Sequence, residues 1–284
     1  MIKRIRDDQT IKGIRTPRRE VKLTAYADDL TALLIDMNDL NNVEKTLNEF
    51  GEISGLNLNQ DKTEVLAIGQ TNLTAEQEEK LKDVIKVTGI CHGLPTKKIE
   101  TKDANFTGPI NKLQRTLNLW KSRNLSLLGR AQIFKAQGLA AFMHIANVIP
   151  IPSDVTSRIN KIMYNFIWRG PDKMSREFMA KPIEEGGLNI AKPEDAFDAA
   201  TLTWVKRSQV SQHPWTDYFF KDCDRIGGLR NLQRNNLSIR DNDMLTFNKS
   251  LFKSIQKIDK ITTGTPALSL KAGIFGNPLI KARN

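Results

Sequence analysis

The sequence lacks the residues and segments that several classes of protein require. Its 284 residues include only two cysteines, Cys91 and Cys223, which excludes a disulfide framework and favours a reducing compartment. The longest apolar stretch, residues 138–151, is interrupted by polar side chains and is shorter than the roughly 18 residues of a membrane-spanning helix. Residues 1–6 contain no apolar core of a secretory signal. We therefore expect an intracellular protein with no membrane partner.

Common catalytic and metal-binding motifs are also missing. Neither Cys91-His92 nor the pair His213 and Cys223 has the ligand spacing of a zinc site. There is no glycine-rich phosphate loop and no convincing serine, histidine and aspartate arrangement. These absences argue against a zinc enzyme, a P-loop protein and a triad hydrolase.

Positive charge is present in excess, and it is unevenly distributed. The chain has 43 Lys and Arg against 32 Asp and Glu, a net charge of +11. Residues 1–96 hold 13 basic and 16 acidic side chains, residues 97–181 hold 15 and 5, and residues 182–284 hold 15 and 11. A concentrated basic block favours a polyanionic partner, of which nucleic acid is the commonest. The alternative is a solvated basic surface that binds nothing.

The first 95 residues alternate between strand-like and helix-like patterns. Val21–Ala25 and Leu30–Ile35 are β-prone runs on either side of a turn, which predicts a hairpin with acidic residues at its tip. Apolar residues at helical spacing predict a helix from about Leu40 that ends near Gly51 or Gly55. Further strands are expected at Leu56–Asn59, Thr63–Ile68 and Val84–Cys91, with a capping box at Thr74–Gln77 opening a helix that runs to about Lys82.

After Pro95 the pattern becomes helical. Ile110, Leu113, Leu117 and Trp120 form one amphipathic stripe. Ser126 is expected to cap a long helix through about Ala146, and Ser153 another that ends near Trp168, giving a basic bundle of roughly three helices. A turn is expected at Gly186–Leu188 and a helix from Pro193 to about Gln209. The signal weakens beyond Ser211, and from about residue 262 no periodicity remains.

The predicted hairpin tip has the chemistry of a magnesium site. Two adjacent aspartates at an exposed turn can hold Mg²⁺, which takes one or two carboxylates together with waters and substrate phosphates. Two such ions can drive in-line phosphoryl transfer. Adjacent aspartates are more often plain turn residues, as expected for Asp7 and Asp8. The strand on each side and the aromatic Tyr26 distinguish Asp28 and Asp29.

Several motifs, in order along the chain, resemble those of reverse transcriptases. Lys22–Leu30 is similar to their Tyr-x-Asp-Asp segment, and Gly55–Thr63 is similar to the Gly-Leu-x-x-Asn-x-x-Lys-Thr segment that follows it. Val87–Ile90 occupies the place of the primer-grip hairpin. The string Leu119–Arg130 resembles the thumb of non-LTR (LINE-type) retrotransposon enzymes, as do Phe166–Trp168 and Glu185–Leu188.

The resemblance implies an α+β protein with three parts. Residues 1–95 would be the C-terminal half of a polymerase palm, an antiparallel hairpin with packed helices. Residues 96–181 would be a helical basic thumb, and residues 182–284 a post-thumb region whose tail from about 262 is poorly ordered. The implied activity is RNA-directed DNA polymerisation in the cytoplasm or nucleus, with two Mg²⁺ ions, an RNA template, a DNA primer and deoxynucleoside triphosphates.

The resemblance also assigns roles to particular residues. Asp28 and Asp29 would hold metal, Tyr26 would lie near the primer terminus, and Lys62 would act as the acid for departing pyrophosphate. Gly89 would let the backbone approach the primer. Lys62 could equally be a surface lysine on a strand edge, and the alternative for Gly89 is an ordinary turn glycine. Basic thumb residues would track phosphates of the duplex: Lys112, Arg115, Lys121, Arg123, Arg130 and Lys135.

One part of the resemblance is incomplete. The family has a third carboxylate on a strand before the Tyr-x-Asp-Asp segment, and a Gln-Gly-x-x-x-Ser-Pro segment; residues 1–20 match neither. We therefore expect little polymerase activity from these 284 residues alone. The alternatives are a non-catalytic nucleic-acid-binding remnant and a pseudogene product.

Overall fold

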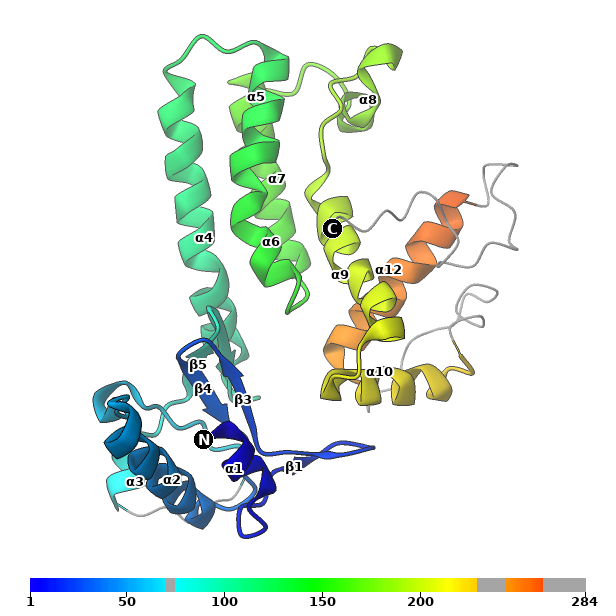
Figure 1. Ribbon diagram of the computed structural model, residues 1–284. Coiled ribbons are helices and arrows are strands. Elements are labelled where there is room, and N and C mark those ends of the chain that lie inside the picture. The colour runs from blue at the N-terminus through cyan, green and yellow to red at the C-terminus, as the bar shows by residue number, and fades with distance from the viewer. Residues whose placement is uncertain (70–74, 229–243, 263–284) are drawn as a thin grey trace. The chain divides into compact units, whose positions relative to one another are not determined.

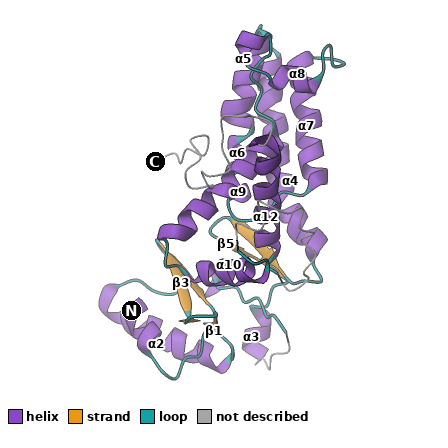
Figure 2. Cartoon of the chain, turned by 90° about the vertical axis from the view of Figure 1, so that its right-hand side faces the viewer, coloured by secondary structure: helices purple, strands orange, loops and turns teal. Residues whose placement is uncertain are grey.

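The computed structural model describes residues 1–69, 75–228 and 244–262, and is mixed α+β, mostly helical, with small antiparallel hairpins. The chain divides into two compact units, Met1–Asn105 and Phe106–Asn284, which are considered separately here (Figure 1). All described strands belong to the first unit, and Figure 2 shows them among its short helices. Among the described residues, no helix is both long and apolar enough to cross a membrane.

The N-terminal unit contains three two-stranded antiparallel sheets and several helices. Its elements are α1 (Ile2–Asp7), β1 (Ile14–Arg15), β2 (Glu20–Val21), β3 (Leu23–Tyr26), β4 (Asp29–Ala32), α2 (Asn38–Ser54), the 3₁₀ helix η1 (Gln60–Lys62), α3 (Ala75–Glu79), β5 (Val84–Val87) and β6 (Ile90–Gly93).

A small apolar core fixes the first 50 residues. Ile5, Ile11, Leu23 and Val43 are each at most 2% exposed and pack together. The Asp39 carboxylate accepts a hydrogen bond from the Lys12 backbone N–H at 2.8 Å, which ties the start of the chain to α2. Burying these side chains from α1, β3 and α2 stabilises the base of the β3–β4 hairpin.

The expected hairpin at residues 21–35 is present. β3 and β4 pair antiparallel with Leu23 opposite Ala32 and Tyr26 opposite Asp29, so Ala27 and Asp28 form a two-residue turn. Ala27 has φ 52°, the left-handed value that a tight hairpin turn requires at its first position. The expected helix after it is also confirmed: α2 ends at Gly55, whose φ is 75° and whose N–H bonds to the Gly51 carbonyl.

The prediction of strands at Leu56–Asn59 and Thr63–Ile68 is wrong. The first run forms no strand, and the Asn59 side chain accepts a hydrogen bond from the Lys62 N–H, which caps η1 instead. In the second run, Val65 makes only an isolated parallel bridge to Leu81. Alternating apolar residues make a sheet only where a partner strand covers them, and Ile68 remains 71% exposed.

Residues 75–93 also differ in detail from expectation. Helix α3 is shorter than the predicted helix, and Thr74, the first residue of the capping box, lies outside the described residues. The single strand expected over Val84–Cys91 is a hairpin, with β5 and β6 joined by Thr88 and Gly89. Both turn residues have positive φ, 47° and 88°, which is the pattern of a type I′ turn.

The second unit is helical. Its elements are α4 (Lys98–Lys121, which begins in the first unit), α5 (Leu127–Ile133), the π-helical turn η2 (Phe134–Gly138), α6 (Ala140–Ala146), α7 (Ser153–Trp168), α8 (Arg176–Ala180), the 3₁₀ helix η3 (Ile183–Glu185), α9 (Pro193–Val210), α10 (Pro214–Arg225) and α12 (Thr246–Thr262).

The predicted bundle of three helical segments is present as α4, the run α5–η2–α6, and α7 (Figure 1). Ile110, Leu113 and Leu117 are at most 2% exposed, which confirms the stripe on α4. Ser126 caps α5 as predicted, since its hydroxyl accepts a hydrogen bond from the Gly129 N–H at 3.1 Å. Ser153 does not cap α7; it is the first helical residue, and the extended Pro152 precedes it without a side-chain cap.

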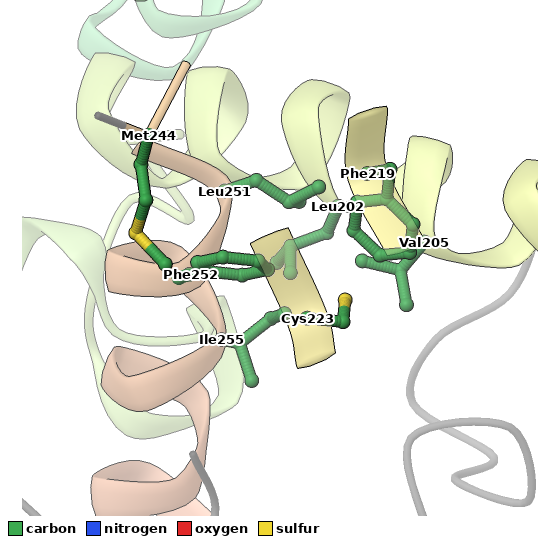
Figure 3. Packing of buried hydrophobic residues seen from close by; sticks show 8 residues of the cluster. All are labelled: Leu202, Val205, Phe219, Cys223, Met244, Leu251, Phe252 and Ile255. Carbon is green, nitrogen blue, oxygen red and sulfur yellow. The ribbon is translucent and has the colours of Figure 1, made fainter. Parts of the chain in front are cut away.

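The turn at residues 186–188 and the helix from Pro193 are confirmed, whereas α10 and α12 were not predicted. These two helices and α9 enclose an apolar cluster, shown in Figure 3: Leu202, Val205, Phe219, Cys223, Met244, Leu251, Phe252 and Ile255. Burial raises the pKa of the Cys223 thiol to about 12, so it remains protonated. The tail expected to be poorly ordered, residues 263–284, lies outside the described residues.

The β5–β6 turn gives a stability prediction. Thr88 is β-branched and disfavours the left-handed conformation that the turn imposes. We expect Thr88→Asn to raise the free energy of unfolding by about 1 kcal/mol, because asparagine tolerates this conformation and Asn-Gly is the preferred type I′ pair. Denaturant unfolding measures the change. Thr88→Val is the control, since it keeps the β-branch; a Val variant as stable as the Asn variant would contradict the interpretation.

Candidate metal turn and basic helical surface

The Asp pair lies at the exposed tip of the β3–β4 hairpin. Both Asp28 and Asp29 are exposed, and the Tyr26 side chain beside them is 72% exposed. Asp28 occupies the second turn position and Asp29 is the first residue of β4, paired with Tyr26. The short turn therefore holds two carboxylates and one phenol close together, on a hairpin whose opposite end is anchored by Leu23 in the core.

The donor set of this turn suits a hard cation only in part. Two carboxylates match the oxygen ligands that Mg²⁺ prefers, and the exposed position leaves room for waters and phosphates. Within residues 1–69, 75–228 and 244–262, however, no group of three or more His, Cys, Asp or Glu side chains gathers in a way that could hold a metal. The described residues therefore fit one weakly held ion rather than a complete two-metal site.

The other pair of adjacent aspartates in the sequence is Asp7 and Asp8, and Asp8 has a local structural role at the end of α1. The Asp8 carboxylate accepts hydrogen bonds from the Thr10 N–H at 2.8 Å and from the Thr10 hydroxyl at 2.6 Å. These bonds lower the pKa of Asp8. The Lys22 ammonium donates to the Arg6 and Asp8 carbonyls at 3.0 and 2.5 Å. Asp8 is therefore a turn-forming residue, as its context in the sequence indicated.

Lys62 and Gly89 each have a clear conformational setting. Lys62 ends η1 with an exposed side chain, and its backbone N–H bonds to the Asn59 side chain. Gly89 takes the second position of the type I′ turn, where its φ of 88° favours glycine. The cap and the turn account for why asparagine stands at position 59 and glycine at position 89, without any bound ligand. The Lys62 ammonium is left facing solvent.

The six predicted phosphate-tracking residues all belong to the helical unit. Five are exposed: Lys112, Arg115, Lys121, Arg123 and Lys135. The sixth, Arg130, is half-buried. Among the described residues, no carboxylate forms an ion pair with any of the six. Unpaired surface cations on helices attract a polyanion at long range.

Two arginines join the ends of the bundle helices. Arg130 Nη1 donates to the Ile167 carbonyl in the last turn of α7 at 2.6 Å. Arg169 Nη2 donates to the Lys121 and Arg123 carbonyls, at and just beyond the end of α4, at 2.8 and 2.7 Å. Arg130 and Arg169 therefore satisfy the Ile167 and Lys121 carbonyls, which lie at helix ends and lack an intrahelical partner. The Arg123 carbonyl also accepts from the Leu125 N–H. Arg130, predicted only as a phosphate contact, has this structural role as well.

The aromatic residues of the thumb-like motifs are mostly structural. Phe166 and Trp168 are 1% and 8% exposed, which confirms that they belong to the core rather than to a stacking surface. Trp120 is half-buried; its Nε1 donates to Gln137 Oε1 at 2.9 Å, and the Arg123 guanidinium lies 5.0 Å from its ring centroid. The cation–π contact orients Arg123 along the surface.

The Glu185–Leu188 segment is explained by its backbone. Gly186 has φ 81° and ends η3. A Cβ atom on Gly187 would lie 2.1 Å from the Lys181 carbonyl oxygen, so no larger residue has room. The Leu188 N–H then bonds to the Met179 carbonyl at 3.0 Å. The glycine pair allows the chain to turn back against α8, and it needs no ligand to account for it.

A comparison of the sequence with models of known protein families finds no match. The site is therefore interpreted from its own residues.

Sequence patterns did not identify Arg169 as a site residue. Its backbone is left-handed, with φ 56°, immediately after the last residue of α7. The signal that could have found it is the Trp168-Arg169-Gly170 string at the end of an amphipathic helix, where a basic residue favours the helix dipole. Its bond partners are 46 and 48 residues away, so spacing alone did not reveal them.

The glycine pair gives a test of the structural interpretation. We expect Gly187→Ala to destabilise the helical unit by about 1–3 kcal/mol, because its methyl group would overlap the Lys181 carbonyl. Gly170→Ala is the matched control, since nothing lies within 4 Å of a Cβ added there. Thermal unfolding of both variants measures the difference. If the two variants are equally stable, the backbone of Gly187 does not approach the Lys181 carbonyl as closely as described.

Proposed function

We propose that this chain supplies the metal-binding turn and the duplex-binding helices of an RNA-directed DNA polymerase of the non-LTR retrotransposon type. The observation that carries the proposal is the two-residue turn that presents Asp28 and Asp29 beside the 72% exposed Tyr26. A polymerase needs carboxylates that a primer terminus and a triphosphate can reach together. An exposed hairpin tip provides this access, whereas carboxylates buried in the core would not.

The turn residues would act on the primer end of the reaction. Asp28 and Asp29 would hold a Mg²⁺ ion through their oxygens, and Tyr26 would lie against the terminal nucleotide of the primer. A pair of bound ions would supply charge neutralisation at the attacking and leaving oxygens. The described residues provide two of the carboxylates that such a site needs, and a further carboxylate is required to position both ions.

The helical unit would bind the duplex. Its exposed cations, such as Lys112 and Arg115 on α4, are suited to phosphates of either strand and carry no base specificity. Contacts of this kind give an affinity that falls steeply with salt. The bundle would then hold a primer–template by its backbone, independently of sequence.

A second candidate function is duplex binding without catalysis. It is favoured by the absence of a third carboxylate at the turn among the described residues. The two functions are distinguished by primer extension with Mg²⁺. Robust extension by residues 1–284 would show a complete site. We expect binding but little or no extension.

The metal proposal predicts weak binding at the turn. We expect Mn²⁺, used as a paramagnetic substitute for Mg²⁺, to bind with millimolar affinity, because two carboxylates and waters give low affinity. Electron paramagnetic resonance of free Mn²⁺ measures the bound fraction. Combining Asp28→Asn with Asp29→Asn should remove this binding, whereas Asp61→Asn, at another exposed acid of the same unit, should retain it. Retention of Mn²⁺ by the double variant would place the ion elsewhere.

The duplex proposal predicts a salt-dependent affinity. Combining Lys112→Gln with Arg115→Gln should weaken binding of an RNA–DNA duplex and reduce the slope of log K against log salt by about 2, because each lost phosphate contact lowers it by about one. Fluorescence anisotropy over a salt series measures both quantities. Glu177→Gln, which removes an exposed negative charge from helix α8, should leave the number of phosphate contacts unchanged. An unchanged slope in the double variant would remove α4 from the interface.

A further inference from the structure

Two arginines bond to backbone carbonyls at the end of the bundle where α4 ends, α5 begins and α7 ends; Figure 1 shows these helix ends. Arg130 bonds to Ile167 in the last turn of α7, and Arg169 follows that turn directly. The neighbouring charge of Arg169 adds to the effect of burial in lowering the pKa of Arg130. Like charges at the same end of the bundle repel each other, and an anion would relieve this repulsion.

The carbonyl bonds leave several donors of the two side chains unused. Arg130 donates through Nη1, and its Nε is buried with no acceptor in residues 1–69, 75–228 and 244–262. Arg169 uses Nη2 for both of its carbonyls, so its Nε and Nη1 have no acceptor among the described residues. A guanidinium presents donors from every nitrogen and matches oxyanions with two parallel bonds. The bonds to helix-end carbonyls therefore use only some of the hydrogen-bond donors of Arg130 and Arg169.

The local charge favours an anion even though helix C-termini are present. Each of the two helix ends contributes roughly minus half an elementary charge. The two guanidinium charges exceed that sum by about one unit, and the exposed Lys121 and Arg123 at the end of α4 raise the excess further. Among the described residues, no carboxylate pairs with Arg130 or Arg169. Nothing described neutralises this end of the bundle.

The carbonyl bonds also hold the two groups in place. Each guanidinium is fixed by a backbone acceptor on a different helix from its own, with bonds of 2.6 to 2.8 Å. Fixing the side chains before a ligand arrives removes most of the entropy cost of ordering them. An exposed lysine such as Lys135 lacks this advantage.

We propose that Arg130 and Arg169 form an anion site for a phosphate group. The group can be a phosphodiester of the nucleic-acid backbone, which rests on the proposed duplex binding, or inorganic phosphate, which does not. In either case the phosphate oxygens accept hydrogen bonds from the remaining donors of Arg169 and from Arg130. The ligand would then lie at the ends of α4 and α7. It is distinct from the exposed cations along α4.

The first experiment uses the full chain without substitutions. Side-chain Nε–Hε signals of Arg130 and Arg169 are followed by nuclear magnetic resonance during titration with sodium phosphate, against sodium chloride of equal ionic strength. We expect both signals to shift in phosphate alone, while the Nε signal of Arg158, in the first turns of α7 at its other end, stays in place. Equal responses to phosphate and chloride would overturn the proposal.

The second experiment identifies the source of the phosphate. Arg169→Gln and Arg130→Gln remove one charge each and keep an amide donor, and Arg158→Gln is the charge-matched control. For an RNA–DNA duplex, we expect either site variant to lower the salt slope by about one relative to Arg158→Gln. An Arg130→Gln variant that fails to fold leaves the test to the exposed Arg169, with folding checked by circular dichroism.

The outcomes separate the anion site from the proposed function. Shifts in phosphate together with a reduced duplex slope support a phosphodiester ligand. Shifts in phosphate with an unchanged slope support the anion site and assign it to free phosphate. If the unsubstituted chain binds no duplex at low salt, the proposed duplex binding fails while the phosphate titration still decides the site. If the Nε–Hε signals of Arg130 and Arg169 do not shift in phosphate, the anion site is contradicted.

Discussion

The pairing of Tyr26 with Asp29 determines the geometry on which the functional interpretation depends. It leaves Ala27 and Asp28 as the entire turn, and so forces both carboxylates to the tip of the hairpin. The turn requires Ala27 to be left-handed, which costs free energy in a residue with a Cβ atom. Packing of Leu23 with Ile5, Ile11 and Val43 at the other end stabilises the hairpin enough to offset this cost. A shift of register by one residue would turn Leu23 out of the core.

The helical unit uses its arginines in two different ways. Arg115 is exposed and has no carboxylate partner in the part of the chain that the structure describes, which leaves its charge available to a polyanion. Arg130 and Arg169 are bound to carbonyls of neighbouring helices, which stabilises the bundle and fixes where their charge lies. A basic block in the sequence therefore combines diffuse attraction with positioned charge. Diffuse charge favours fast, nonspecific association with a polyanion, whereas positioned charge favours a defined point of contact.

Local patterns predicted the elements that depend on local residues. The β3–β4 hairpin, the α4 stripe and the Ser126 cap follow from apolar spacing and from short-range hydrogen bonds, and all three are present. The strands expected around residues 56–68 are not, because strand formation needs a partner that the sequence does not indicate. Helix α12 was missed for the opposite reason. Its Leu251 and Phe252 are buried against Leu202 and Val205, about 50 residues earlier in the chain.

The same distinction applies to the candidate site. Asp28 and Asp29 were predicted from one contiguous segment of the sequence. The acceptor of Arg130 lies 37 residues away, so local patterns could not predict this bond. The number of carboxylates that can meet around a metal is likewise a property of the fold. A motif thus indicates which side chains carry the chemistry, and long-range packing decides which of them come together.

The most direct test of the account is photo-crosslinking of a primer–template whose primer ends in a photoreactive nucleotide. If the Asp28–Asp29 turn belongs to a polymerase site, the 3′ terminus should crosslink within the β3–β4 hairpin, with Tyr26 as the main site, and Tyr26→Ala should reduce the yield. Photoreactive groups within the duplex should instead label α4. Crosslinks from the primer terminus that avoid residues 23–32 altogether would contradict the central claim.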